Sequence, residues 1–231
     1  MPLRDERPDA LYSMPVTTRR VGENDTRISV AILAGGESRR MGRDKGLLPL
    51  GGTSMIEAIA AQLSPYADEV IIGSNDAEAY AFTGLRVVPD LERGYGPMMG
   101  VLSCLEAARC RSVLFAPCDV PVIPDGFVRL MLEAAAEADL AMPLDRLGRP
   151  EPLLAAYSRR CAPAIRRLLD GGVRRVAALM GEAIRAEYGL TLSLVRQPDM
   201  GWYRNVNTAA DYEALLAERA GRPGDTGRSG T

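Results

Sequence analysis

A glycine-rich stretch after a short apolar run carries the residue types that bind a triphosphate. Gly35 and Gly36 come first, and glycines let the backbone approach a ligand closely and turn its N–H groups toward an anion. Four cations follow close together in the sequence: Arg39, Arg40, Arg43 and Lys45. Gly42 is followed by Arg-Asp-Lys rather than directly by Lys-Ser or Lys-Thr, so this is not a Walker A loop. We predict a nucleoside triphosphate site at residues 33–45.

A second chemical signal is Asp119, which follows an apolar run and lies between Pro117 and Pro121. Magnesium in phosphate-transfer sites takes one or two carboxylates besides phosphate oxygens and waters. Asp119 is therefore a candidate magnesium ligand. The alternative is an aspartate that only closes a turn or caps a helix. Cys118 beside it is expected to be a small buried residue rather than a nucleophile.

The absence of histidine narrows the chemistry further. A histidine general base is excluded, and so are Ser-His-Asp and Cys-His nucleophile systems. Metal ions, carboxylates, Lys, Arg and backbone dipoles remain. Nucleotidyl transfer needs little else, because positioning and charge neutralisation supply most of its catalysis.

The composition of the chain limits which partners and which cellular compartment we expect. The net charge of −2 and the lack of any Lys/Arg run give no sign of nucleic-acid binding. No apolar stretch approaches the roughly 20 residues that span a bilayer, and no secretion signal is evident. The four cysteines form no C-x-x-C pair. We expect reduced thiols in a cytoplasmic protein that binds neither nucleic acid nor membrane.

The elements that must position these residues alternate along the chain. Apolar runs predict strands at residues 28–33, 69–73, 86–89, 112–116, 140–142, 153–157 and 191–195. Helical periodicity predicts helices at residues 54–63, 101–108, 127–138, 163–169, 174–180 and 209–218. This order predicts an α/β fold with a doubly wound, mostly parallel sheet and helices on both faces. Ligands of such sheets bind beyond the carboxyl ends of the strands.

The predicted domain organisation is simple. Residues 1–26 are rich in Pro, Asp, Arg and Thr without apolar periodicity, and we predict a disordered extension. Residues 27–218 form a single predicted domain, and residues 219–231 a flexible tail.

Four segments resemble, in the same order, the signature of the molybdenum cofactor guanylyltransferase family. Residues 33–48 read Leu-Ala-Gly-Gly-Glu-Ser-Arg-Arg-Met-Gly-Arg-Asp-Lys-Gly-Leu-Leu, as in the family's nucleotide-binding loop. Residues 96–100 read Gly-Pro-Met-Met-Gly, where the family has Gly-Pro-Leu-Ala-Gly. Residues 117–121 read Pro-Cys-Asp-Val-Pro, and residues 205–211 read Asn-Val-Asn-Thr-Ala-Ala-Asp. The resemblance covers roughly residues 28–216.

This resemblance implies a nucleotidyltransferase with the Rossmann-type fold of the nucleotide-diphospho-sugar transferases. It implies transfer of GMP from GTP to molybdopterin with magnesium, releasing pyrophosphate. The implied partners are GTP, the molybdenum cofactor, and proteins that deliver the cofactor or the molybdoenzymes that receive it.

The resemblance also implies roles for individual residues. The residues expected to contact or bind the nucleotide are Leu33, Ala34, Gly35, Gly36, Lys45, Asp90 and Asp119. By the resemblance, Lys45 binds phosphate and Asp119 also holds the metal. Independently of the family, the basic residues of the loop suggest that Arg39 or Arg40 helps to offset charge during transfer. The family usually has an Asn at or near the end of its second strand, where this sequence has Gly73 and, two residues on, Asn75.

Residues near the C-terminus leave two interpretations open. Thr208 and Asp211 match a helix-capping pattern, which requires neither Asn205 nor Asn207. These two asparagines are therefore candidates for ordering the acceptor phosphate or magnesium-bound waters.

Three other functions remain open at this stage. A cytidylyltransferase for the same cofactor and a sugar-phosphate nucleotidyltransferase share the chemistry. A non-catalytic nucleotide-binding module would share only the binding.

Overall fold

The computed structural model describes residues 28–35, 44–145, 147–196 and 205–220. The predicted N-terminal extension lies outside these ranges. Of the predicted C-terminal tail only residues 219–220 are described, and they form the end of a helix.

Seven strands form one sheet in the order β5-β4-β1-β6-β8-β7-β9. The strands are β1 (Ile28–Leu33), β4 (Glu69–Gly73), β5 (Arg86–Val88), β6 (Ser112–Pro117), β7 (Leu140–Pro143), β8 (Ala156–Ser158) and β9 (Leu192–Val195). All pairings are parallel except those of β8, which runs antiparallel to both β6 and β7. The predicted mostly parallel α/β sheet is confirmed.

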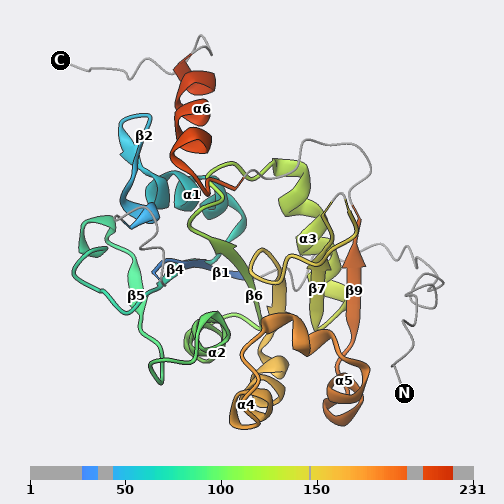
Figure 1. The fold of residues 1–231 in the computed structure, drawn as a ribbon. Helices are drawn as coiled ribbons and strands as arrows, with labels where there is room; N and C mark the ends of the chain where they lie inside the picture. Colours follow the sequence, from blue (N-terminus) through green and yellow to red (C-terminus); the bar gives the residue numbers. More distant parts are fainter. Residues whose placement is uncertain (1–27, 36–43, 146, 197–204, 221–231) are drawn as a thin grey trace, which may run out of the picture.

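Helices cover both faces of the sheet (Figure 1). They are α1 (Met55–Leu63), α2 (Pro97–Ala107), α3 (Asp125–Glu137), α4 (Ala162–Asp170), α5 (Glu182–Tyr188) and α6 (Ala209–Ala220). Alternate strand residues serve alternate faces, as strand geometry requires. In β6, Phe115 faces the core beneath α2 and α4, whereas Leu114 and Ala116 face the core beneath α1 and α3.

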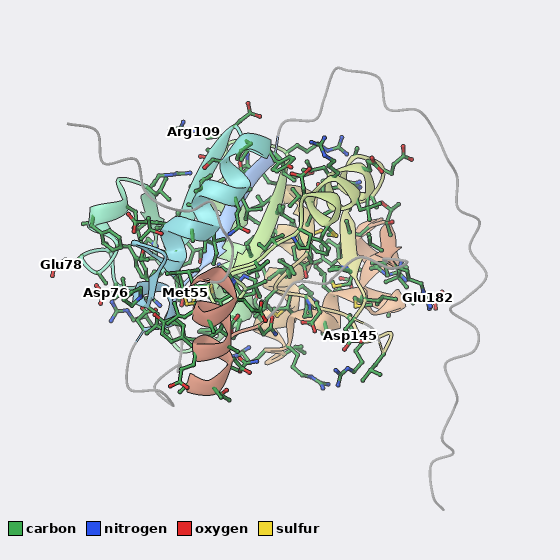
Figure 2. All side chains as sticks on the ribbon, turned by 90° about the horizontal axis from the view of Figure 1, so that it is seen from above. Met55, Asp76, Glu78, Arg109, Asp145 and Glu182 are labelled. Atoms are coloured by element: carbon green, nitrogen blue, oxygen red, sulfur yellow. The ribbon has the colours of Figure 1, made fainter. Side chains whose placement is uncertain are left out.

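A third, smaller core attaches the C-terminal helix. The hairpin of β2 (Pro49–Leu50) and β3 (Thr53–Ser54) precedes α1. Leu50 and Met55 pack there against Val206 and Leu215, and Figure 2 shows Met55 beside α6. This packing holds the C-terminal segment next to the loop that contains Lys45.

Several predicted boundaries need correction. The helix predicted at 101–108 begins at Pro97, because Gly96 turns the chain with a φ of +72° and proline suits a first helical turn. The strand predicted at 153–157 is confined to Ala156–Ser158, and the helix predicted at 174–180 is a 3-10 helix over Val176–Met180. Helix α5 and the β2–β3 hairpin are not predicted from the sequence, because both are short elements with little periodicity.

No helix in the described part of the chain is long and apolar enough to cross a membrane.

Candidate active site

The carboxyl ends of the four parallel strands β5, β4, β1 and β6 share one edge of the sheet. Backbone hydrogen bonds continue beyond the strand ends and align the loops there. The N–H of Ala34 donates to the carbonyl of Gly73 at 2.9 Å, and the N–H of Cys118 donates to that of Leu33 at 2.9 Å. Residues of two separate sequence motifs therefore meet at this edge, beside the end of β4.

Lys45 is the central side chain of the site. It begins the short 3-10 helix η3 (Lys45–Leu47) and is only 9% exposed. Its Nζ donates to Oδ2 of Asp119 at 3.2 Å and to Oδ1 of Asn207 at 3.1 Å. A buried ammonium group needs such partners, because burying an unpaired charge is costly. The structure thus joins the first, third and fourth sequence motifs through one side chain.

The start of α6 delivers Asn207 to Lys45. The N–H of Val206 donates to the carbonyl of Asp119 at 2.7 Å. Asp211 accepts from the N–H of Asn207 at 2.9 Å and from that of Thr208 at 2.8 Å. The hydrogen bond from the Thr208 N–H holds the pKa of Asp211 below its ordinary value. The predicted cap is confirmed, and it leaves the Asn207 side chain to Lys45; Asn205 is exposed.

Asp90 lies at the other end of the same edge, after β5. Asn75 donates through Nδ2 to its Oδ2 at 2.8 Å and accepts from its N–H at 2.9 Å. Gly73, by contrast, has no room for a side chain: a Cβ there would lie 2.8 Å from Cys104 Sγ and 3.0 Å from Leu33 Cδ2. Beyond the end of β4, the amide that contacts Asp90 is that of Asn75, a residue that the sequence motifs do not predict for the site.

The described part of the glycine loop fits a close approach of ligand. Leu33 is partly buried, Ala34 is buried and Gly35 is exposed. Gly35 has a φ of +96°, a conformation that favours glycine. Gly36 and Arg39, together with Arg40 and Arg43, lie outside the described residues, so their predicted roles stay predictions.

Cys118 is buried directly beside Asp119. Burial, reinforced by the charge of Asp119, raises the pKa of its thiol to about 12. The predicted role of a small buried residue agrees with this, because a thiol that stays protonated is a poor nucleophile.

The segment between β5 and α2 is tied to the helical layer below the sheet. Arg166 of α4 forms an ion pair with Glu92 at 2.6 Å. The Arg174 guanidinium lies 4.2 Å from the centre of the Tyr95 ring. These two arginines therefore contact the loop that follows Asp90.

The two ends of this edge carry side chains of opposite charge. Lys45 offers positive charge next to β1 and β6, which suits phosphates. Asp90 offers a carboxylate next to β5, which suits the N–H donors of a base. Three strand intervals separate β6 from β5, or about 14 Å at the usual spacing of parallel strands. That span suits a nucleotide lying along the edge.

The donor set at the phosphate end fits a magnesium ion that is shared with a nucleotide. The Asp119 side chain is 27% exposed, so its carboxylate can be reached from solvent. One accessible carboxylate matches magnesium's preference for few protein ligands alongside phosphate oxygens and waters.

A doubly wound sheet with this edge is the architecture of an α/β nucleotidyltransferase. The chain belongs to the family of the MobA-like NTP transferase domain, whose model matches residues 30–186. The family resemblance predicted from the sequence is confirmed.

Two curated relatives and one solved structure illustrate this membership. A protein of Pelotomaculum thermopropionicum named "Probable molybdenum cofactor guanylyltransferase" is 42% identical over 197 residues, covering 83% of this chain and 95% of its own. The "Molybdenum cofactor guanylyltransferase" of Pasteurella multocida is 34% identical over 190 residues, covering 80% and 97%. The crystal structure of molybdopterin-guanine dinucleotide biosynthesis protein A from Archaeoglobus fulgidus is similar in fold, with a TM-score of 0.66 at 23% identity, over 84% of this chain and all of that one.

Proposed function

We propose that this protein transfers GMP from GTP to molybdopterin, forming the guanine dinucleotide cofactor and releasing pyrophosphate. The observation that carries the proposal is the position of Lys45, held by both Asp119 and Asn207 at the carboxyl edge of a nucleotidyltransferase sheet. The names of the relatives, at 34% and 42% identity, supply the substrate pair.

In the proposed reaction, an oxygen of the acceptor's terminal phosphate forms a bond to the α-phosphorus of GTP. The bond between that phosphorus and the α–β bridging oxygen breaks, and pyrophosphate leaves with the electron pair. The attacking phosphate is already anionic near neutral pH, so no strong base is needed. This agrees with a chain that contains no histidine.

Each residue of the edge has a proposed role. Lys45 and the N–H groups of Gly35 and Gly36 offset charge on the phosphates, together with Arg39. Asp119 would hold magnesium, which supplies further charge neutralisation when bound. Asp90, positioned by Asn75, accepts N–H donors of the base. Asn205 is proposed to lie toward the acceptor.

We further propose that the protein works in the cytoplasm. All four cysteines are free, as expected where thiols stay reduced. Proteins that deliver or receive the cofactor remain proposed partners.

A single-turnover assay with GTP, magnesium and molybdopterin, read by pyrophosphate release, tests the function. Asp119→Asn and Lys45→Ala should each lower turnover at saturating GTP by at least about 100-fold, the scale of losing one charge-stabilising group. Asp125→Asn is the control, because Asp125 is exposed on α3 and pairs with Arg129. Full turnover in either site variant would overturn the assignment.

Parallel arms of the assay separate the alternatives. Pyrophosphate release with CTP but not GTP would indicate a cytidylyltransferase. Release with a sugar phosphate but not molybdopterin would indicate a different acceptor. Binding of GTP without pyrophosphate release, given molybdopterin, would indicate a non-catalytic module.

A further inference from the structure

A buried tyrosine outside all four sequence motifs contacts the loop of Lys45. Tyr80 precedes the 3-10 helix η5 (Ala81–Thr83), in the connection between β4 and β5. Its side chain is fully buried in the core that includes Ile32 and Ile72. Its hydroxyl donates to Oδ2 of Asp44 at 2.6 Å, across 36 positions of the sequence.

Asp44 connects Tyr80 to the backbone around Lys45. Its other oxygen, Oδ1, accepts from the N–H of Gly46 at 3.0 Å and so caps the 3-10 helix that starts at Lys45. One carboxylate thus holds the residue after Lys45 with one oxygen and the rigid core with the other. The backbone of Lys45 lies between these two anchored residues.

The fit between Tyr80 and this loop is tight. A Cβ added at Gly46 would lie 2.8 Å from the Tyr80 hydroxyl oxygen and 3.3 Å from its ring. The loop backbone therefore rests directly on the phenol, and a shift of the phenol would move the loop.

We infer that Tyr80 is a positioning residue for phosphate binding: acting through Asp44, it sets the place of the Lys45 ammonium group relative to Asp119 and Asn207. The inference rests on the proposed function in one respect, namely that Lys45 binds nucleotide phosphates. Nothing in the family signature includes Tyr80, so its role comes from the tertiary contact alone.

The hydrogen bond has a fixed direction. Burial and the neighbouring Asp44 carboxylate raise the pKa of the Tyr80 phenol well above its ordinary value. The phenol therefore stays protonated and donates to Asp44 throughout the pH range in which the enzyme can be assayed.

Tyr80→Phe removes the donor and keeps the ring in the core. We expect the Kd and KM for GTP to rise by about 10-fold, the scale of one hydrogen bond to a charged group, with kcat at saturating GTP within about twofold. Binding of inorganic tripolyphosphate, measured by calorimetry, should weaken to a similar degree, because the contact concerns phosphate rather than the base.

Tyr157→Phe is a matched control. Tyr157 is also fully buried, and its hydroxyl donates to the carbonyl of Pro152 at 2.7 Å, in a different part of the fold. Like Tyr80→Phe, the Tyr157→Phe substitution removes one hydroxyl from a buried tyrosine. It therefore reports the loss of stability that this removal causes, without an effect on Lys45. Its affinity for GTP and tripolyphosphate should equal that of the unmodified protein.

A double-mutant cycle tests the route through Asp44. If Tyr80 acts through this carboxylate, Tyr80→Phe should add little further loss of affinity once Asp44→Ala is present. Gly46→Ala provides a second approach, since its methyl group would press on the phenol and should weaken tripolyphosphate binding with Tyr80 intact.

The outcomes distinguish this inference from the proposed function. If Tyr80→Phe binds GTP and tripolyphosphate as tightly as the unmodified protein does, the inference is overturned and the proposed function is not affected. Tripolyphosphate binding that weakens in Tyr80→Phe, in a protein that never releases pyrophosphate, would support the inference and overturn the function. Additive losses in the double-mutant cycle would overturn the route through Asp44.

Discussion

The Nζ atom of Lys45 lies 3.2 Å from Oδ2 of Asp119, although the two residues are 74 positions apart. The lysine side chain is 11% exposed and the aspartate side chain 27%. The pair is thus open mainly on its carboxylate side. A bound phosphate would take the place of the Asp119 carboxylate as a partner of Lys45, and a metal ion would take the place of Lys45 as a partner of Asp119. A nucleotide and its magnesium are therefore expected to bind together at this point.

Asn207 should tune the affinity of Lys45 for phosphate rather than the chemical step. Asn207→Ala removes the acceptor that lies 3.1 Å from Nζ, and a hydrogen bond to a charged group contributes about 1.5–3 kcal/mol. We expect KM for GTP to rise by about 10-fold with kcat nearly unchanged, measured by steady-state pyrophosphate release. Asp125→Asn is the control, and an unchanged KM in Asn207→Ala would contradict this role.

Base selectivity should reside at Asp90 and Asn75. ITP lacks the 2-amino group of GTP, so a carboxylate that accepts from guanine should favour GTP by about 10-fold or more. Asp90→Asn should abolish most of this preference. Asn75→Ala should weaken it, because Asp90 loses the amide that donates to it at 2.8 Å. The ratio of kcat/KM for GTP and ITP measures the effect, and an unaltered ratio in Asp90→Asn would exclude Asp90 from base recognition.

Three buried thiols should make the fold sensitive to alkali. Burial raises the pKa of Cys104, Cys118 and Cys161 to about 12. In the unfolded chain thiols ionise near pH 8.5, so above that pH the unfolded state binds fewer protons than the folded state. The contribution of these thiols to the free energy of unfolding is therefore fully present below about pH 8.5. It is lost as the pH rises toward about 12, by about 1.4 kcal/mol per pH unit for each thiol.

Urea unfolding at several pH values from 8 to 10 measures this loss. Cys161→Ala should reduce the slope of unfolding free energy against pH, whatever it does to stability at pH 8. Cys110→Ala controls for the loss of a thiol as such, because Cys110 is only partly buried. Equal slopes in the unmodified protein and Cys161→Ala would contradict the prediction.

Gly73 should resist any side chain, including the Asn that the family pattern suggests there. A Cβ at this position would lie 2.8 Å from Cys104 Sγ, and overpacking of this kind costs about 1–3 kcal/mol. We expect Gly73→Ala to lower the free energy of unfolding by that amount in urea. Cys104→Ala should relieve much of the cost by removing the sulfur atom. A Gly73→Ala cost that is the same in both backgrounds would show that the thiol is not the obstacle.

Much of the fold follows from local patterns. Strands 28–33 and 69–73 are predicted at the bounds where β1 and β4 occur, because a buried strand is a short apolar run. The helix at α1 is equally local, since its capping box of Ser54 and Glu57 lies within one turn. Short elements such as α5 are not predicted, because seven residues are too few to show a clear helical periodicity.

The amino-acid sequence alone establishes which chemical groups are available: a glycine loop with Lys45, a carboxylate at Asp119, no histidine, and strands that carry these residues. Which side chains meet depends on the tertiary structure. Asn207 reaches Lys45 across 162 positions, and Tyr80 reaches Asp44 across 36. Such contacts depend on strand order and on the packing of α6 against the β2–β3 hairpin. Local periodicity carries no information on either, because it reports only which face of an element is buried.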